Sequence, residues 1–312
     1  MDEQTPPLSD LSESIIRTLA YFDLFDHPIT VAEIFFNLPT NHVTSVEIEM
    51  ELPILEKRSL IFRLGNFYSL QDNPAIENRR VIGNIQAKKY MDIAAKKTNF
   101  IAQFPFVRSV MISGSLSKGY ADDQSDIDFF IITKPGRLWI ARTLLVLYKR
   151  IFLFNSHKYF CVNYFVDTEH LQIEEENIFT ATELATLIPL YGKGHHHNLL
   201  RQNKWLLQFF PNFVTIPSAD ASPSDGMLKR TGEWILNLCF PAVLDRFFMR
   251  LTLRRWKKMY GNVFPAADFG IAFKTDRHVS KNHPKNYQRQ IVARYKERVQ
   301  AFHKHFGMNP VA

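Results

Sequence analysis

The apolar positions of the first 60 residues recur every three or four residues, which predicts short amphipathic helices. The second and third of these helices begin at Thr30 and Thr44, each followed three residues later by a glutamate that completes a capping box. A turn at Gly65-Asn66 then separates two short apolar runs, which is the pattern of a β-hairpin. The N-terminal part is therefore expected to consist of three helices followed by a hairpin.

This order of elements resembles a winged helix, so we predict a winged-helix-like domain over residues 1–75. In DNA-binding members of that class the third helix commonly enters the major groove. Here residues 1–78 hold 13 acidic and 4 basic residues, and the third helix is itself rich in glutamate. DNA affinity depends on neutralising phosphates with Lys and Arg, so a structural or protein-contact role is expected rather than DNA binding.

Longer apolar runs follow this part of the chain. Strands are predicted around residues 110–112, 129–132 and 159–167, and helices around residues 80–97, 137–154, 181–190 and 227–259. The predicted fold class is α/β (α+β), with a mixed sheet and flanking helices in residues 76–190. Residues 191–312 are predicted to form a helical, basic C-terminal region.

Polar residues of chemical interest gather where the first predicted strand ends and the second begins. Gly114-Ser115 follows the first strand, and Asp126 and Asp128 open the second. Two acids at spacing i, i+2 share one face of a strand and suit a hard divalent cation. A residue without a Cβ, followed by a small hydroxyl, lets backbone N–H groups approach phosphate oxygens. The stretch therefore indicates a site for metal and phosphate.

This pattern resembles the nucleotidyltransferase superfamily that includes DNA polymerase β, whose signature is Gly-Ser after one strand and Asp-x-Asp at the start of the next. The spacer between Ser115 and Asp126 is similar in length to that of small bacterial members, and the resemblance covers roughly residues 105–170. It implies Mg²⁺, with two ions possible, on Asp126 and Asp128, and the phosphates of an NTP on Gly114 and Ser115. Lys118, within the spacer, is a further candidate for phosphate binding.

Members of this family that transfer nucleotides usually supply a third carboxylate from a later strand, which completes the metal site and accepts the proton of the attacking hydroxyl. In the predicted strand 159–167, Asn163 and Asp167 share one face by alternation. Asn163 stands at the centre, where the third acid is expected, but an amide is no general base. Asp167 takes that position if the register differs, so both residues stay candidates.

The sequence thus favours a Mg-dependent, nucleotidyltransferase-like protein that transfers a nucleoside monophosphate from an NTP to a hydroxyl of RNA, a protein or a small molecule. Two alternatives stay open. One is a catalytically degenerate nucleotide-binding or scaffold protein, and the other is a winged-helix regulator with a nucleotide-sensing core. The basic helix 227–259 has three interpretations: a solvated face, a surface for RNA or acceptor phosphates, or a helix lying on anionic lipid.

Other features of the sequence indicate the cellular location of the protein. No secretory signal is evident, and no apolar run approaches the roughly 20 residues that a membrane span needs. The two cysteines, Cys161 and Cys239, lack metal or disulfide spacing, which is typical of a reducing compartment. A cytoplasmic protein without a transmembrane segment is therefore expected.

Overall fold

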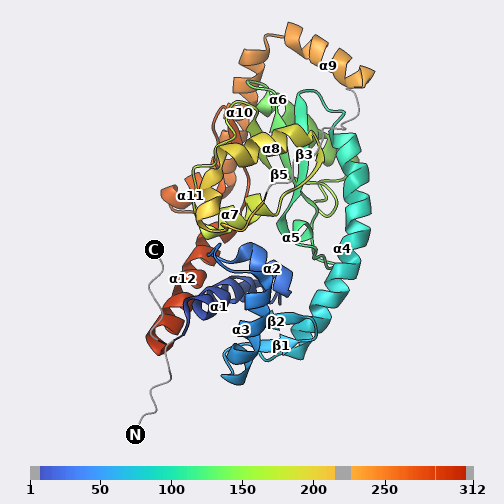
Figure 1. Cartoon of the computed structure of the whole chain (residues 1–312). Helices are drawn as coiled ribbons and strands as arrows, with labels where there is room; N and C mark the ends of the chain where they lie inside the picture. The colour runs from blue at the N-terminus through green and yellow to red at the C-terminus, as the bar shows by residue number, and fades with distance from the viewer. Residues whose placement is uncertain (1–7, 215–225, 285, 307–312) are drawn as a thin grey trace.

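The computed structural model describes residues 8–214, 226–284 and 286–306, shown in Figure 1. The N-terminal module, residues 10–69, contains three α-helices, a 3₁₀ turn and a hairpin. Its elements are α1 (Asp10–Phe22), η1 (Asp23–Phe25), α2 (Val31–Asn37), α3 (Ser45–Lys57), β1 (Phe62–Leu64) and β2 (Phe67–Ser69). Both predicted capping boxes are confirmed, because the hydroxyls of Thr30 and Thr44 accept from the backbone of Glu33 and Glu47. The predicted hairpin around Gly65 is also confirmed.

A five-stranded mixed sheet forms the centre of the molecule, with strand order β6-β3-β4-β5-β7. The strands are β3 (Val107–Ser113), β4 (Asp128–Thr133), β5 (Cys161–Asp167), β6 (Ile188–Tyr191) and β7 (Val279–Lys281). Only the β4–β5 pair is parallel, whereas β3–β4, β3–β6 and β5–β7 are antiparallel. The mixed α/β class predicted from the sequence is thus confirmed, although both edge strands, β6 and β7, were not predicted.

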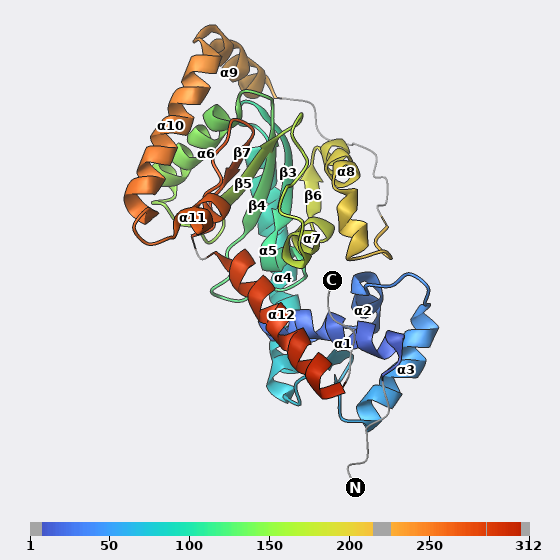
Figure 2. The same ribbon diagram turned by 90° about the vertical axis from the view of Figure 1, so that its left-hand side faces the viewer.

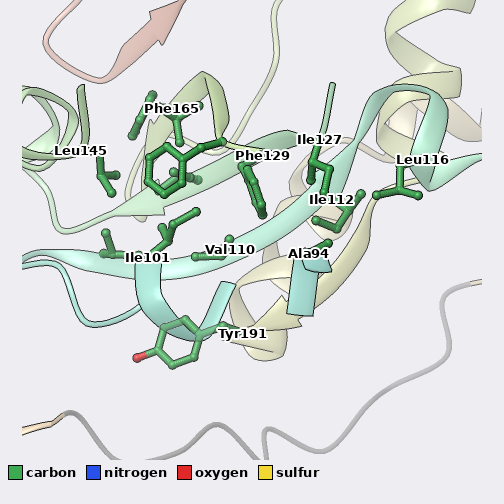
Figure 3. Packing of buried hydrophobic residues seen from close by; sticks show 14 of the residues in the cluster. Ala94, Ile101, Val110, Ile112, Leu116, Ile127, Phe129, Leu145, Phe165 and Tyr191 are labelled. Atoms are coloured by element: carbon green, nitrogen blue, oxygen red, sulfur yellow. The ribbon is translucent and has the colours of Figure 1, made fainter. Parts of the chain in front are cut away.

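Alternate side chains of the sheet face two separate helical layers, as expected for a sheet covered on both sides. Val110, Ile112 and Phe129 face a layer that includes α4 (Pro74–Ile101), α6 (Leu138–Phe152) and Trp256, and Figure 3 shows part of this packing. Met111 and Phe130 face the opposite layer, which contains α7, α8 and η2. The bounds of these three elements are Ile178–Ala185, Lys193–Gln202 and Lys204–Gln208.

The C-terminal residues are distributed over the whole structure, in contrast to the predicted separate region 191–312. The helices α9 (Met227–Leu238) and α10 (Pro241–Tyr260) form a hairpin at the end of the sheet farthest from the N-terminal module (Figure 1). After α11 (Ala266–Ala272), strand β7 joins the sheet. The last helix, α12 (Tyr287–Phe306), then lies against the N-terminal module (Figure 2), where Ile291 joins its core.

One predicted helix is wrong in its second half. Residues 181–190 were expected to be helical, but α7 ends at Ala185 and residues 188–191 form strand β6. Pairing with β3 outweighs the local helical pattern here. The residues Ile188 and Tyr191, which lie on either side of Pro189 in the sequence, both contribute side chains to the core. No helix of the described ranges is long and apolar enough to cross a membrane.

Candidate functional site

The predicted Gly-Ser turn and the second aspartate lie side by side because of the strand pairing. Ser113, the last residue of β3, pairs with Asp128, the first residue of β4. Gly114 follows with φ +70, and a Cβ there would stand 2.5 Å from Asp128 Oδ2. Only glycine combines this backbone conformation with so close an approach. The turn then continues as the short helix α5 (Gly114–Ser117), on which Ser115 is partly exposed.

Asp126 lies on the same side of the chain as Asp128. Between them Ile127 is fully buried and held in an extended segment, since its N–H donates to the Lys158 carbonyl and its own carbonyl accepts from Cys161 N–H. Alternation then turns both aspartates away from the Ile127 side, and both are partly exposed. The charge of Asp126 also helps to raise the pKa of Asp128, in agreement with this proximity.

Asn163 is the strand residue that stands beside Asp128. A β-bulge between the β4–β5 pairs Phe129–Val162 and Phe130–Tyr164 leaves Asn163 without a partner in the register. Its Nδ2 donates to Asp128 Oδ1 at 2.7 Å, and its Oδ1 accepts from the Cys161 thiol at 3.2 Å. The position expected for a third acid is therefore taken by an amide.

Asp167 lies at the other end of β5, paired with Thr133, the last residue of β4. Its buried carboxylate accepts from the side chains of His170 and His278. The register that would bring Asp167 beside Asp126 and Asp128 is not the one found, because the parallel pairing starts with Asp128 opposite Cys161. Asp167 consequently belongs to a different part of the molecule.

Glu183, on α7, is a site residue that the sequence reasoning missed. Its Oε2 accepts from Gly114 N–H at 3.3 Å, and its Oε1 accepts from Lys118 Nζ at 2.8 Å. Lys118 Nζ also donates to the Gly114 carbonyl at 3.1 Å. The Glu183 carboxylate thus accepts hydrogen bonds from the two groups that were predicted to bind phosphate. The only signal for Glu183 in the sequence was its position as the single charged residue among the alanine, threonine and leucine residues of 181–187.

The electrostatic balance of this site is negative close to Asp128. Burial is the largest cause that raises the pKa of Asp128 to about 7, and the charges of Asp126 and Glu183 raise it further, while the Cys161 hydrogen bond and Lys118 lower it. Lys149, on α6, is a buried cation near Asp126 and lies 3.3 Å from His157. Burial lowers the pKa of Lys149. The negative charges of Asp126, Asp128 and Glu183 thus exceed the positive charge placed next to them. Such an excess of negative charge favours the binding of a cation.

A pocket of about 610 Å³ adjoins α5 and lies between the N-terminal module and the core. Its walls include Phe22 and Phe36 from the module, Arg80 and Asn84 from α4, and residues 116–119. Buried Arg80 Nε and Asn84 Oδ1 have no hydrogen-bond partner. Arg80, Lys88 and Lys118 line the pocket beside its apolar side chains, a combination that suits a small polar ligand.

Comparison of the chain with protein-family models, with characterised proteins and with solved structures gave no match in any of the three. The function is therefore argued from the geometry of the site.

Proposed function

We propose that this protein binds a magnesium nucleoside triphosphate at Gly114, Ser115, Asp126 and Asp128, and that it belongs to the nucleotidyltransferase class. The single observation that carries the proposal is the approach of Gly114 to Asp128, where a Cβ would stand 2.5 Å from the carboxylate. A phosphate-binding turn and a metal-binding acid thereby share one small space. The antiparallel β3–β4 pair and the parallel β4–β5 pair support the same assignment.

The residues present fit a divalent cation. Asp126 and Asp128 offer carboxylate oxygens, and burial first, then the charges of Asp126 and Glu183, raise the pKa of Asp128 to about 7, so that a bound cation would offset an unfavourable buried charge. Magnesium bound there would neutralise phosphate charge and polarise the α-phosphoryl group for attack by a hydroxyl. The protein itself would orient the nucleotide, and a bound cation would favour the ionised form of Asp128.

Lys118 and the Gly114 N–H are the groups proposed to bind the outer phosphates. In the present structure Glu183 accepts hydrogen bonds from both. A triphosphate carries more charge than one carboxylate and offers more acceptor oxygens, so it would replace Glu183 at these donors. Nucleotide binding is thus coupled to a movement of the Glu183 side chain.

The acceptor is proposed to be a small polar molecule bound in the pocket beside α5. Phe22, Phe36 and Met91 supply apolar walls there, and Arg80, Lys88 and Lys118 add charged side chains to the lining. The volume, about 610 Å³, suits a small ligand better than a polymer. A DNA acceptor is disfavoured by the acidic N-terminal module that forms one wall.

Calorimetry with Mg²⁺ and a non-hydrolysable NTP tests this proposal. The wild-type protein is expected to bind one nucleotide, whereas Asp126→Asn and Asp128→Asn should each weaken binding at least tenfold. Asp123→Asn, an exposed acid of the same loop, is the matched control and should bind as the wild type does. Equal binding by all four proteins would rule the site out.

A second candidate, a protein that binds nucleotide without transferring it, is favoured by one observation. Asn163 supplies an amide to Asp128 where an acid would act as general base. Incubation with labelled NTPs and candidate acceptors separates the two functions, since this second candidate binds nucleotide but labels no acceptor. Asn163→Asp, which restores the acid, should then raise transfer at least tenfold if only the base is missing.

A further inference from the structure

A second group of metal-competent side chains lies far from Asp126 and Asp128, at the opposite end of β5. Asp167, His170 and His278 each offer a ligand atom, and these three atoms lie within 4.8 Å of one another. Within the described ranges it is the only such group of three. Each oxygen of Asp167 faces one imidazole, with Oδ1 2.9 Å from His170 Nδ1 and Oδ2 2.7 Å from His278 Nδ1.

Burial and backbone hydrogen bonds hold these three side chains in place. Asp167 is fully buried, and the backbone N–H groups of Glu169 and His170 fix its Oδ1. The backbone of His278 pairs with that of Asp167, whose N–H donates to the His278 carbonyl. The two imidazole rings stack with centroids 3.4 Å apart, which holds both of them beside the Asp167 carboxylate.

We propose that Asp167, His170 and His278 bind Zn²⁺. Two nitrogens and one carboxylate oxygen form the three-ligand set typical of zinc sites that keep an open fourth position. His170 is 47% exposed, which leaves that position accessible to water. Magnesium prefers oxygen ligands and would compete poorly, so the two metal sites of this protein should differ in the ion they select.

Zinc titration of the full-length, metal-stripped protein tests the site. We expect one Zn²⁺ bound per chain, a rise in melting temperature on addition, and at least a tenfold weaker affinity in His170→Ala and His278→Ala. His42→Ala and His197→Ala, two exposed histidines elsewhere, are the controls and should bind normally. Asp126→Asn should also bind zinc normally, which separates this site from the proposed nucleotide site. Absence of stoichiometric binding, or unchanged binding in both triad variants, would overturn the proposal.

The helical hairpin of α9 and α10 carries an independent inference, because it exposes many large apolar side chains. Both views show it at the end of the molecule opposite the N-terminal module. The side chains that are about half exposed or more include Met227, Leu228, Trp234, Ile235, Leu238, Phe240, Val243, Phe247 and Leu251. So many exposed apolar side chains on two consecutive helices indicate an interaction site.

Positive charge accompanies this apolar surface. Val243, Phe247 and Leu251 recur every four residues along α10, and Arg246, Arg250 and Arg254 follow at the same period, so both rows run along one face. A groove of about 380 Å³ lies between them.

The two acids of the hairpin do not oppose these arginines. Glu233 is bound to Arg108, and Asp245 is buried, where it accepts from the N-terminal backbone N–H groups of α6. The hairpin therefore presents cations and apolar groups together, with no exposed acid between them.

We infer that this hairpin lies on a membrane surface rich in anionic phospholipid. Arginines beside Trp, Phe and Leu side chains are the pattern of interfacial helices, whose apolar row enters the boundary between headgroups and acyl chains. A nucleic acid would meet the same arginines, but six of these nine exposed side chains are aliphatic and offer no stacking surface for bases, which favours lipid over nucleic acid. The hairpin would hold the protein at the surface without spanning it.

Sedimentation with lipid vesicles tests this inference. The full-length protein should bind vesicles that contain 30% phosphatidylserine, and should bind neutral phosphatidylcholine vesicles far less. Replacing Arg246, Arg250 and Arg254 with alanine is expected to weaken binding about 100-fold. Phe247→Ala with Leu251→Ala should weaken it at least tenfold. Alanine at the exposed Lys89, Lys96 and Arg201 is the matched charge control and should leave binding unchanged.

Tryptophan fluorescence gives a second readout without any label. Trp234 is 65% exposed, while Trp139, Trp205 and Trp256 are buried, so a blue shift on vesicle addition reports on α9. Trp234→Phe should abolish the shift and keep most of the binding. Equal binding to neutral and anionic vesicles, preferential binding of single-stranded RNA, or a dimer that covers the hairpin would each contradict the inference.

Discussion

Among the individual side chains, Asp128 is one whose charge near neutral pH depends on its surroundings. Its pKa is raised to about 7, first by burial and then by the charges of Asp126 and Glu183. Only the ionised carboxylate binds a cation, so protons and magnesium compete for it. Affinity for magnesium should therefore increase up to tenfold per pH unit below about 7 and level off above that value.

The same shift makes the stability of the fold depend on pH. The pKa of Asp128 is higher in the folded state than in an unfolded chain, so the protein loses stability as pH rises from about 4 to about 7. Asp128→Asn removes this loss and should be more stable than the wild type by about 2 kcal/mol at pH 8, but not at pH 4. Urea unfolding at both values measures the difference, with Asp123→Asn as the control. A difference that is the same at both pH values would contradict this explanation.

Glu183 is expected to compete with phosphate. Glu183→Gln removes the negative charge that accepts from Gly114 N–H and Lys118, and it also lowers the repulsion on Asp128. Affinity for magnesium NTP should rise about threefold to tenfold, as measured by calorimetry at pH 7. Glu49→Gln, at an exposed position on α3, should have no effect. Weaker binding by Glu183→Gln would instead make Glu183 part of the metal site.

For the secondary-structure elements, the sequence was most informative where local chemistry determines the outcome. The capping boxes at Thr30 and Thr44 and the hairpin turn at Gly65 depend on neighbours within a few residues, and all three were predicted. The edge strands β6 and β7 have four and three residues, too few for a period to show, and exist through pairing with β3 and β5. The contact of Glu183 with Gly114 depends on how α7 packs, which no local pattern contains.

The turn between β6 and α8 requires glycine at one position. Gly192 has φ +67, and a Cβ there would stand 2.1 Å from the carbonyl oxygen of Arg108 in the neighbouring strand. Gly192→Ala should therefore cost about 2–4 kcal/mol of unfolding free energy, because backbone atoms must move. Gly136→Ala has a similar φ but no atom within 4 Å, so it should cost only about 1 kcal/mol. Equal losses in chemical denaturation would contradict the steric explanation.

For the protein as a whole, α12 is the element through which the C-terminal part of the chain packs against the N-terminal module. It lies against α1 (Figure 2), and Tyr295 contacts the ring of Tyr21 with centroids 5.8 Å apart. Ile291 is 5% exposed within the core of the N-terminal module. The module is thus completed by residues more than 200 positions further along the chain.

This packing predicts a large effect of a change near the C-terminus on the N-terminal module. Ile291→Ala should reduce the unfolding free energy by about 2–4 kcal/mol, because it leaves a cavity in the core. Lys296→Ala, on the exposed side of the same helix, should change it by less than about 0.5 kcal/mol. Hydrogen exchange of α1 amides measures the local effect, and unchanged protection in Ile291→Ala would show that α12 does not support the module.

The return of α12 also has a consequence during synthesis. Roughly 220 residues separate the end of β2 from the start of α12, so at 5–20 residues per second the ribosome needs roughly 10–45 s to make them. During that interval the nascent module exposes the apolar side chains that α12 later covers. The growing polypeptide should consequently be a client of chaperones until α12 has emerged from the ribosome, and its first domain should become resistant to protease only then.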